Sequence, residues 1–445
     1  MAKLAIHGGS KVLPKGMLGI DNVDLGTLPK WPIITDREKN AVMGALNSGI
    51  LMGAYAPQVS ALQKEWAQYI GTKYCMATGS GTSALHIAVK GAGIKCGDEV
   101  ITSAFTFVAS AFGALQTNAI PVFVDIDPVT FNMDPAKIEA RISEKTRAIM
   151  PVHLHGLPAD MDEINAIAKK YGLVVIEDAC QAHGAYYKGK KVGTLGDIST
   201  FSLNGSKNLP GAEGGLLNTD NEKFFFEARK VRDLGEIIEE GVERDYNAFE
   251  IGWMYRYNEM LAAFTRVRLE NLDAENEIRV KNANYLSSKL SQLKGIKTPY
   301  VPDDRTSVYH LYRIRLNPKE LGIDASPKEF RAKVQKSLRA EGIQANRWGN
   351  RPVPMQNVFQ DRIGYGYGCP WTCPYGKGSD VKYNEEDYIE TRRLCDDSFV
   401  IHSAIYPPNG FDLLDKYVEA FHKLWDNLDE VMEVTIKPEE IYLKE

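Results

Sequence analysis

Between residues 75 and 220, short apolar runs alternate with segments that have helical spacing. The apolar runs predict buried strands at 99–103, 120–125, 148–153 and 172–176, and the spacing predicts helices at 81–92, 107–117 and 160–170. Near-continuous apolar strands separated by helices are typical of a mostly parallel sheet covered on both faces. Ligands of such sheets bind beyond the carboxyl ends of the strands. The pattern therefore predicts an α/β domain with a binding crevice at that edge.

After Asn258 a long helical pattern begins, with apolar residues at Met260, Leu261, Phe264, Val267 and Leu272, and it becomes charged from Asp273 onward. We interpret this helix as the connection to a second domain. There, alternation over 308–316 predicts a half-buried strand, and 327–341 a charged helix. We expect a large domain at 1–272, with an N-terminal arm, and a smaller α+β domain at 273–445.

The segment 346–385 is rich in Gly, Pro, Trp and Tyr and shows no periodicity. It predicts a long loop, and loops of that length in compact enzymes are often active-site walls.

Composition favours an ordinary globular protein. The 445 residues include 44% hydrophobic and 25% charged side chains, and the net charge is −5. That charge gives no electrostatic reason to expect nucleic acid or an anionic membrane as a partner. No stretch approaches the roughly 18 apolar residues of a membrane span, and the first residues lack a signal-peptide core. We expect a cytoplasmic protein.

The six cysteines are scattered, which argues against a disulfide framework. Cys369 and Cys373, in Cys-Pro-Trp-Thr-Cys, have a spacing that metal sites use. A structural zinc site requires four ligands in paired clusters, and no second pair lies nearby in the sequence. We therefore expect no metal site there.

Candidate chemistry centres on Lys207 and Asp178. Lys207 follows the run Phe201-Ser202-Leu203, and Asp178 ends the run Val174-Val175-Ile176. Pyridoxal phosphate (PLP) requires such a pair, because an amine forms the Schiff base and a carboxylate keeps the pyridine nitrogen protonated. Both residues fall at carboxyl ends of predicted strands, so they can converge on one crevice.

Other residues suit the rest of that cofactor. Gly81 and Thr82 lie in a small-residue turn that opens a helix, where backbone N–H groups suit a phosphate; alone, such a turn is more often a plain cap. Ser202 offers a second hydroxyl for the phosphate. Phe107 could stack on the ring or be an ordinary core residue, and Gln181 could reach the ring hydroxyl.

In this order along the chain, the motifs resemble the DegT/DnrJ/EryC1/StrS family of sugar aminotransferases, within the fold type I PLP enzymes. The matching segments are 81–85, 105–110, 122–127, 151–156, 177–184, 201–207, 211–215 and 252–263. The resemblance covers about residues 5–275 well and the remainder loosely. It implies a large domain with a mostly parallel seven-stranded sheet and a smaller C-terminal α+β domain.

The resemblance also implies roles. Lys207 would hold PLP and move the proton between substrate and cofactor, Asp178 would pair with the pyridinium, and Phe107 would stack on the ring. The phosphate would be bound by Gly81, Thr82 and Ser202.

In this family the segment 252–259 reaches the neighbouring subunit's site. That implies a homodimer with shared active sites and Arg256 near the partner's phosphate. Alternatively, the segment packs against its own domain and leaves Arg256 on the surface.

Three departures from the family pattern affect these expectations. Met254 stands where many relatives have Asn, so the phosphate contact across the interface falls to Arg256 or is missing. Cys180 replaces a small Ala and is interpreted as a packing residue. The stretch 348–383 is longer and more aromatic than usual, which leaves the acceptor pocket least defined.

The leading functional hypothesis is an aminotransferase that uses glutamate or glutamine. Its acceptor would be a nucleotide-linked keto-sugar or a keto-cyclitol, in the biosynthesis of amino sugars, cell-surface polysaccharides or secondary metabolites. A sugar dehydratase of the same fold is an alternative, but such enzymes typically carry histidine in place of the Schiff-base lysine. A non-catalytic regulatory or sensor protein is another alternative. The presence of Lys207, Asp178 and Gln181 argues against it.

Overall fold

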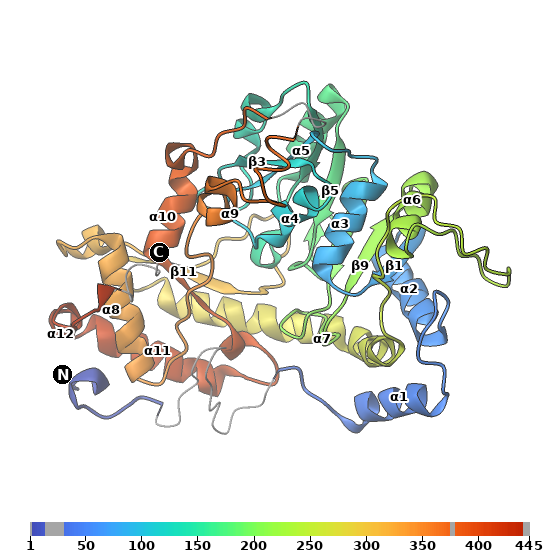
Figure 1. Cartoon of the computed structure of the whole chain (residues 1–445). Coiled ribbons are helices and arrows are strands. Elements are labelled where there is room, and N and C mark those ends of the chain that lie inside the picture. Colours follow the sequence, from blue (N-terminus) through green and yellow to red (C-terminus); the bar gives the residue numbers. More distant parts are fainter. Residues whose placement is uncertain (1, 14–30, 374–378, 439–445) are drawn as a thin grey trace.

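The computed structural model of the chain describes residues 2–13, 31–373 and 379–438 (Figure 1). Parts of the predicted N-terminal arm and of the predicted loop at 346–385 lie outside these residues.

A seven-stranded sheet dominates the larger part of the molecule, as predicted. Its order is β1-β9-β8-β5-β4-β2-β3, and its strands are β1 (Tyr74–Thr78), β2 (Glu99–Ser103), β3 (Ile120–Val124), β4 (Thr146–Met150), β5 (Val174–Asp178), β8 (Ile198–Ser202) and β9 (Gly215–Thr219). Only β9 runs antiparallel to its neighbours. The predicted strands are all present, although β4 begins earlier than its apolar run indicated. A separate two-stranded ribbon consists of β6 (Tyr186–Tyr187) and β7 (Lys190–Lys191).

Helices cover both faces of this sheet. They are α2 (Pro57–Ile70), α3 (Gly81–Gly91), α4 (Ala109–Leu115), α5 (Met161–Tyr171) and α6 (Glu222–Arg232). Strand β1 shows the two-sided burial directly, because Cys75 and Ala77 pack in the cluster that holds Trp66 of α2, while Met76 packs with Leu85 of α3. Successive side chains of a strand alternate between faces, so near-continuous apolar strands require a helix layer on each side.

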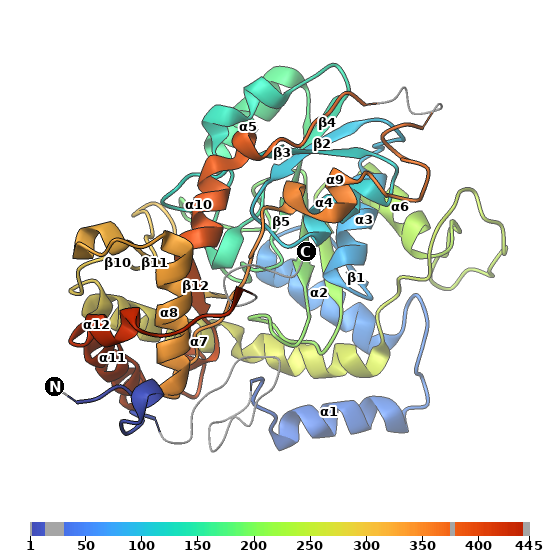
Figure 2. The same ribbon diagram turned by 60° about the vertical axis from the view of Figure 1, so that its left-hand side comes forward.

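The helix α7 (Glu259–Leu290) links the two parts of the molecule without a break at residues 272 and 273 (Figure 2). Its first half contacts α2 and α1 (Asp36–Asn47). Its second half places Ala283, Leu286 and Leu290 in the core of the smaller part. The division of the chain at 272 stays a prediction.

The smaller part is an α+β unit. A three-stranded antiparallel sheet has the order β10 (Ile296–Lys297), β11 (Tyr312–Leu316), β12 (Ser398–Ile401). It packs with α8 (Pro327–Ala340), α10 (Ile389–Asp397), α11 (Phe411–Trp425) and α12 (Leu428–Met432). Leu4 is buried in the same core, and the Ala5 N–H donates to Glu341 Oε1 at 2.8 Å, so the first residues of the chain lie against this part.

The predicted strand at 308–316 is divided between two neighbours. Only Tyr312–Leu316 forms β11, whereas Val308 and His310 donate their N–H groups to the carbonyls of Gly156 and His155 in the larger part. This stretch therefore joins the two parts at the edge where the crevice was expected.

The segment 346–385 is irregular, but most of it is anchored against the β3 edge of the large sheet. Its described residues include the 3-10 helix η6 (Val353–Met355) and the short helix α9 (Asn357–Gln360). Trp371 Nε1 donates to Tyr383 Oη at 2.9 Å, and Tyr383 in turn donates to the Pro121 carbonyl at 2.8 Å. These buried aromatics cover an edge strand, which explains their number in an aperiodic segment.

Folding brings a third cysteine to the Cys-Pro-Trp-Thr-Cys motif, which sequence spacing did not reveal. Cys96 contacts Cys373, and burial followed by this contact raises the pKa of Cys96 to about 11. Cys369 Sγ lies 4.0 Å from Asn118 Oδ1. Among the described residues no cluster of His, Cys, Asp and Glu has the arrangement of a metal site.

No helix in the described residues combines the length and the apolar character needed to cross a membrane.

Candidate active site

A cavity of about 410 Å³ lies at the carboxyl ends of the sheet strands and is closed by the smaller part. Its wall includes the following predicted site residues: Gly81, Thr82, Phe107, Asp178, Gln181, Ser202 and Lys207. Arg256 does not line it. These seven residues therefore converge on one cavity, and the prediction that Arg256 lies near the partner's phosphate stays untested within one chain.

One end of the cavity is formed by the start of α3. Ser80 caps the helix by accepting the Ser83 N–H at 3.0 Å, while the N–H groups of Gly81 and Thr82 precede the helical ladder and so have no acceptor within it. A Cβ on Gly81 would lie 2.8 Å from the Ser202 Cβ, so only glycine lets the helix approach the end of β8 this closely. Free amides, a helix dipole and two hydroxyls fit a phosphate.

The cavity wall also holds Asp178, the last residue of β5. Its carboxylate is buried; Oδ2 accepts from Ser110 Oγ at 2.6 Å and Oδ1 accepts from the Cys180 N–H at 3.2 Å. Both partners are neutral, and in the described part of the chain no cationic side chain forms an ion pair with it. A buried carboxylate with neutral partners suits a ligand that brings its own positive N–H, as a pyridinium does. The start of α3 thus fits the phosphate of PLP, and Asp178 fits its ring nitrogen.

Lys207 lies in the turn between β8 and β9. Its N–H donates to the Asn204 carbonyl at 2.9 Å, and its own carbonyl accepts from Trp31 Nε1 at 3.2 Å, which fixes the backbone. Burial lowers the pKa of the Lys207 amine, while the nearby Cys180 and Asp178 act in the opposite direction. A lowered pKa increases the neutral, nucleophilic fraction of the amine.

Phe107 is 59% exposed and lines the cavity. The alternative of an ordinary core phenylalanine is therefore wrong for this ring. An aromatic ring that is left open at a cavity wall is available to stack on a planar ligand.

Cys180 lines the cavity close to Asp178, and its side chain is partly buried. Burial, followed by the charge of Asp178, raises the pKa of its thiol well above the usual value. The thiol therefore stays protonated and is a poor nucleophile.

Arg256 lies beside the phosphate end of the site, but its side chain is directed elsewhere. Its backbone forms a bridge with Thr78, and the Gly79 N–H donates to the Tyr255 carbonyl at 2.7 Å. The guanidinium lies 3.0 and 3.1 Å from Met254 Sδ and 3.8 Å from Asp233 Oδ1. Within one chain, then, this cation does not reach the cavity.

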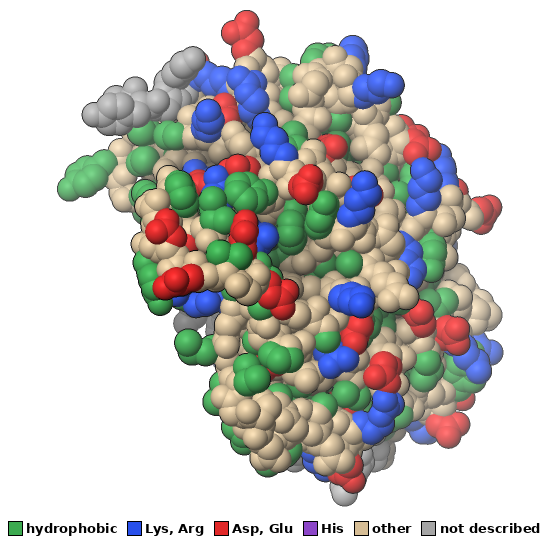
Figure 3. Space-filling view, turned by 90° about the vertical axis from the view of Figure 1, so that its right-hand side faces the viewer, with side chains coloured by type: hydrophobic (Ala, Val, Ile, Leu, Met, Phe, Trp, Pro, Cys, Tyr) green, Lys and Arg blue, Asp and Glu red, His purple; other side chains and the backbone are tan. Residues whose placement is uncertain are grey.

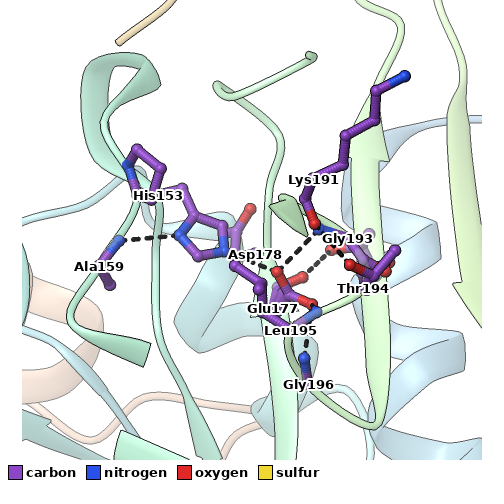
Figure 4. Close-up of polar contacts among 12 residues, drawn as sticks. His153, Ala159, Glu177, Asp178, Lys191, Gly193, Thr194, Leu195 and Gly196 are labelled. Carbon is purple, nitrogen blue, oxygen red and sulfur yellow. Dashed lines mark hydrogen bonds and ion pairs between the residues drawn. The ribbon is translucent and has the colours of Figure 1, made fainter. Parts of the chain in front are cut away.

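A buried network behind Asp178 was not anticipated from the sequence (Figure 4). Glu177 accepts hydrogen bonds from the N–H groups of Gly193, Leu195 and Gly196 at 2.7–2.9 Å. His153 Nδ1 accepts the Ala159 N–H at 3.0 Å, so its proton lies on Nε2 and is donated to Glu177 at 2.9 Å. Because alternate residues of a strand face opposite sides, Glu177 anchors the end of β5 while Asp178 faces the cavity.

The smaller part supplies the wall opposite the sheet. Its lining residues are His310, Leu311, Asn346, Arg347, Trp348, Val400 and His402. Burial lowers the pKa of His402 to about 3 and that of His310 well below its usual value, so both imidazoles are neutral. Their segments carry no motif, and only the aperiodicity of 346–385 hinted at such a wall.

The model of the DegT/DnrJ/EryC1/StrS aminotransferase family matches residues 32–374. A "pleiotropic regulatory protein" of Geobacillus stearothermophilus is 41% identical over 325 residues, which cover 72% of this chain and 82% of that protein. An L-glutamine:scyllo-inosose aminotransferase of Streptomyces griseus is 36% identical over 423 residues, which cover 91% of this chain and 95% of the enzyme.

Among solved structures, a 3-amino-5-hydroxybenzoic acid synthase superposes with a TM-score of 0.79. The two sequences are 26% identical, and the match covers 90% of this chain and 98% of the synthase. The sequence comparison and the structural comparison thus identify the same family over most of the chain.

Proposed function

The chain belongs to the DegT/DnrJ/EryC1/StrS aminotransferase family, and we infer from this membership and from the cavity that it is a PLP-dependent aminotransferase of amino-sugar or aminocyclitol biosynthesis. The observation that carries the inference is the joint position of Lys207, Asp178 and the start of α3 in one cavity wall.

Each residue then has a defined task. Bound PLP supplies an aldehyde for the amine and a ring that accepts electrons from the bond broken at Cα. Lys207 Nζ binds the cofactor and moves the proton at Cα of the amino donor. Asp178 holds the proton on the ring nitrogen. The amides of Gly81 and Thr82 and the Ser202 hydroxyl bind the phosphate, and Phe107 covers the ring.

We propose a keto-cyclitol as the acceptor and glutamine as the donor. The support is the scyllo-inosose aminotransferase, whose similarity extends over 91% of this chain. Acceptor contacts would come from the wall that the smaller part provides. A match that covers 91% of the chain includes most of the residues of that wall. Neutral His310 and His402 are suited to hydrogen bonds with ring hydroxyls.

Incubation of the PLP-loaded protein with glutamine and then with a panel of inososes and nucleotide-linked keto-sugars tests this assignment. We expect glutamine to bleach the visible absorbance of the bound cofactor and an inosose to restore it, with the aminocyclitol identified by mass spectrometry. If only a nucleotide-linked keto-sugar restores the absorbance, the acceptor is that sugar and the proposed cyclitol is wrong. Failure of every amino donor to change the absorbance would refute the transaminase assignment.

We further propose a homodimer with shared sites. Large hydrophobic side chains are exposed at Met52 and on the segment that leads to Arg256: Met52 (81%), Tyr246 (75%), Phe249 (59%), Ile251 (78%) and Met254 (54%). The segments that carry them are connected, because Tyr55 Oη donates to the Ile238 carbonyl at 3.0 Å. Hydrophobic side chains also gather on this side of the molecule in Figure 3. Exposed apolar surface of this kind marks association sites.

A symmetric dimer through this face would bring Arg256 to the partner's phosphate site. Arg256→Ala is then expected to weaken PLP binding about tenfold, the loss of one charge-assisted hydrogen bond. At a PLP concentration that leaves Arg256→Ala homodimers mostly without cofactor, mixing Lys207→Ala with Arg256→Ala subunits should partly restore activity, because each heterodimer contains one intact site.

The matched control mixes Lys207→Ala with Asp178→Asn. Both residues belong to the same chain's cavity, so neither heterodimer site is intact and no activity should return. If confirmed subunit exchange restores nothing in the Arg256 mixture, Arg256 acts within its own chain and the shared-site model is wrong.

A cytoplasmic location is part of the proposal. None of the six cysteines, all of which lie in the described residues, forms a disulfide, which is usual in a reducing compartment.

A further inference from the structure

Gln181 lines the cavity beside Asp178, and its amide has a defined orientation. The His155 backbone N–H, which can only donate, lies 2.8 Å from Gln181 Oε1. The side-chain oxygen therefore faces His155. This leaves the amide nitrogen, a donor, for the cavity side.

The His155 imidazole reinforces this orientation. Its Nε2 lies 2.9 Å from Arg313 Nε. Because a guanidinium has no acceptor, Nε2 must be unprotonated, and the proton lies on Nδ1. Nδ1 lies 3.3 Å from the same Gln181 oxygen, so the imidazole is a second donor to it. Burial first and then the charge of Arg313 lower the pKa of His155 well below its usual value, which keeps the ring neutral.

Arg313 is itself unusual. It belongs to β11 of the smaller part, is 2% exposed, and donates to Ser398 Oγ at 2.7 Å and to the Trp348 carbonyl at 2.8 Å. Among the described residues it has no carboxylate partner; Asp397, whose charge acts on Arg313, forms its ion pair with Arg315. Burial lowers the pKa of Arg313 to about 9. A buried cation without a carboxylate is costly, so its presence suggests a functional reason.

We propose that Arg313 and His155 are positioning residues that hold the Gln181 amide as a hydrogen-bond donor to the ring hydroxyl oxygen of bound PLP. The proposal rests on the PLP site inferred above. It means that a residue of the smaller part sets the electronic state of a cofactor held by the larger part. A donor at that oxygen stabilises its deprotonated form. Losing the donor should raise the pH at which the visible absorbance of the bound cofactor changes.

The test compares Arg313→Met with Arg331→Met, each titrated with PLP. Arg331 is a matched control, because it is equally buried, donates to the Cys395 carbonyl at 2.7 Å and lies outside the cavity wall. We expect Arg313→Met to weaken PLP binding about tenfold, the value of one hydrogen bond, and to raise the pH midpoint of the absorbance change. Arg331→Met should lower thermal stability without altering either quantity.

Two further comparisons keep the proposal testable if Arg313→Met does not fold. His155→Asn retains a donor toward Gln181 and tolerates the backbone φ of 56° at this position, so its absorbance midpoint should stay near that of the unmodified protein. His155→Phe has no donor and should shift it. In a Gln181→Met background, neither the Arg313 change nor the His155 change should add a further shift.

The outcomes separate this inference from the function. If the unmodified protein binds no PLP, the proposed function fails. If it binds PLP but folded Arg313→Met and His155→Phe proteins keep the original affinity and midpoint, the positioning role is wrong while the transaminase assignment stands. Additive shifts in the Gln181→Met background would also refute it.

Discussion

Replacement of Lys207 by alanine is expected to reduce transamination at least about 10³-fold, because proton transfer by a positioned group alone contributes on the order of 10²–10⁴. The same change should abolish the borohydride-stable attachment of PLP to the protein, since no amine remains at the cavity wall in the described residues. Rate measurements and peptide mapping after reduction provide the two readouts.

Lys191→Ala is the matched control. Burial also lowers the pKa of this lysine, but its Nζ donates to the Tyr69 carbonyl and lies over the Tyr69 ring, outside the cavity. Turnover and labelling should both survive this change. A lowered lysine pKa would then not suffice for attachment, and position in the cavity would be the deciding property. Label recovered at another lysine of an active Lys207→Ala protein would overturn the assignment.

The Asp178→Asn protein is expected to bind PLP and to lose about 10²-fold or more in turnover, the usual effect of removing one electrostatic contact to the reacting system. An amide carries no charge and cannot hold the proton on the ring nitrogen. Hydrogen bonds to Ser110 and to the Cys180 N–H can persist, because an amide still accepts and donates at those positions.

Asp125→Asn offers the same chemical change at the end of another strand. Asp125 directly follows β3, is buried, and accepts hydrogen bonds from the Glu390 and Thr391 N–H groups at 3.0 and 2.9 Å. Its replacement should cost about 1–3 kcal/mol of unfolding free energy but leave the rate per folded molecule unchanged. Equal losses of rate in the two variants would mean that Asp178 serves only the fold.

The large sheet and one side of its site were predictable because local pattern and global fold agree there. Buried parallel strands have apolar sequences, and the residues that follow such strands lie at the same edge of the sheet. The proximity of Asp178 and Lys207 could therefore be predicted from the sequence. Strand limits were less certain, as β4 shows, because apolar character continues through Pro151 and Val152 beyond the ladder.

The other side of the site was not predictable for a physical reason. His310, Trp348 and His402 come from three separate segments that meet only when the smaller part closes over the sheet. Cys96 and Cys373 show the same limit, because their proximity depends on how an aperiodic segment is anchored over β3. Glu177 was overlooked because two adjacent carboxylates end β5 and only strand alternation separates their tasks.

Helix α7 sets a condition for making chimeras with related enzymes. Asn208, the residue after Lys207, donates to Asn276 Oδ1 at 2.8 Å and to the Val308 carbonyl at 2.9 Å. Asn276 donates in turn to the His183 carbonyl at 2.8 Å. In a chimera with its crossover at residue 272, Asn276 and Val308 would come from the other enzyme. The residues that hold the Lys207 turn would then change together with the acceptor wall. Exchange beyond Val308 would transplant the later wall segments, at 346–348 and 400–402, while the native lysine turn keeps its own scaffold.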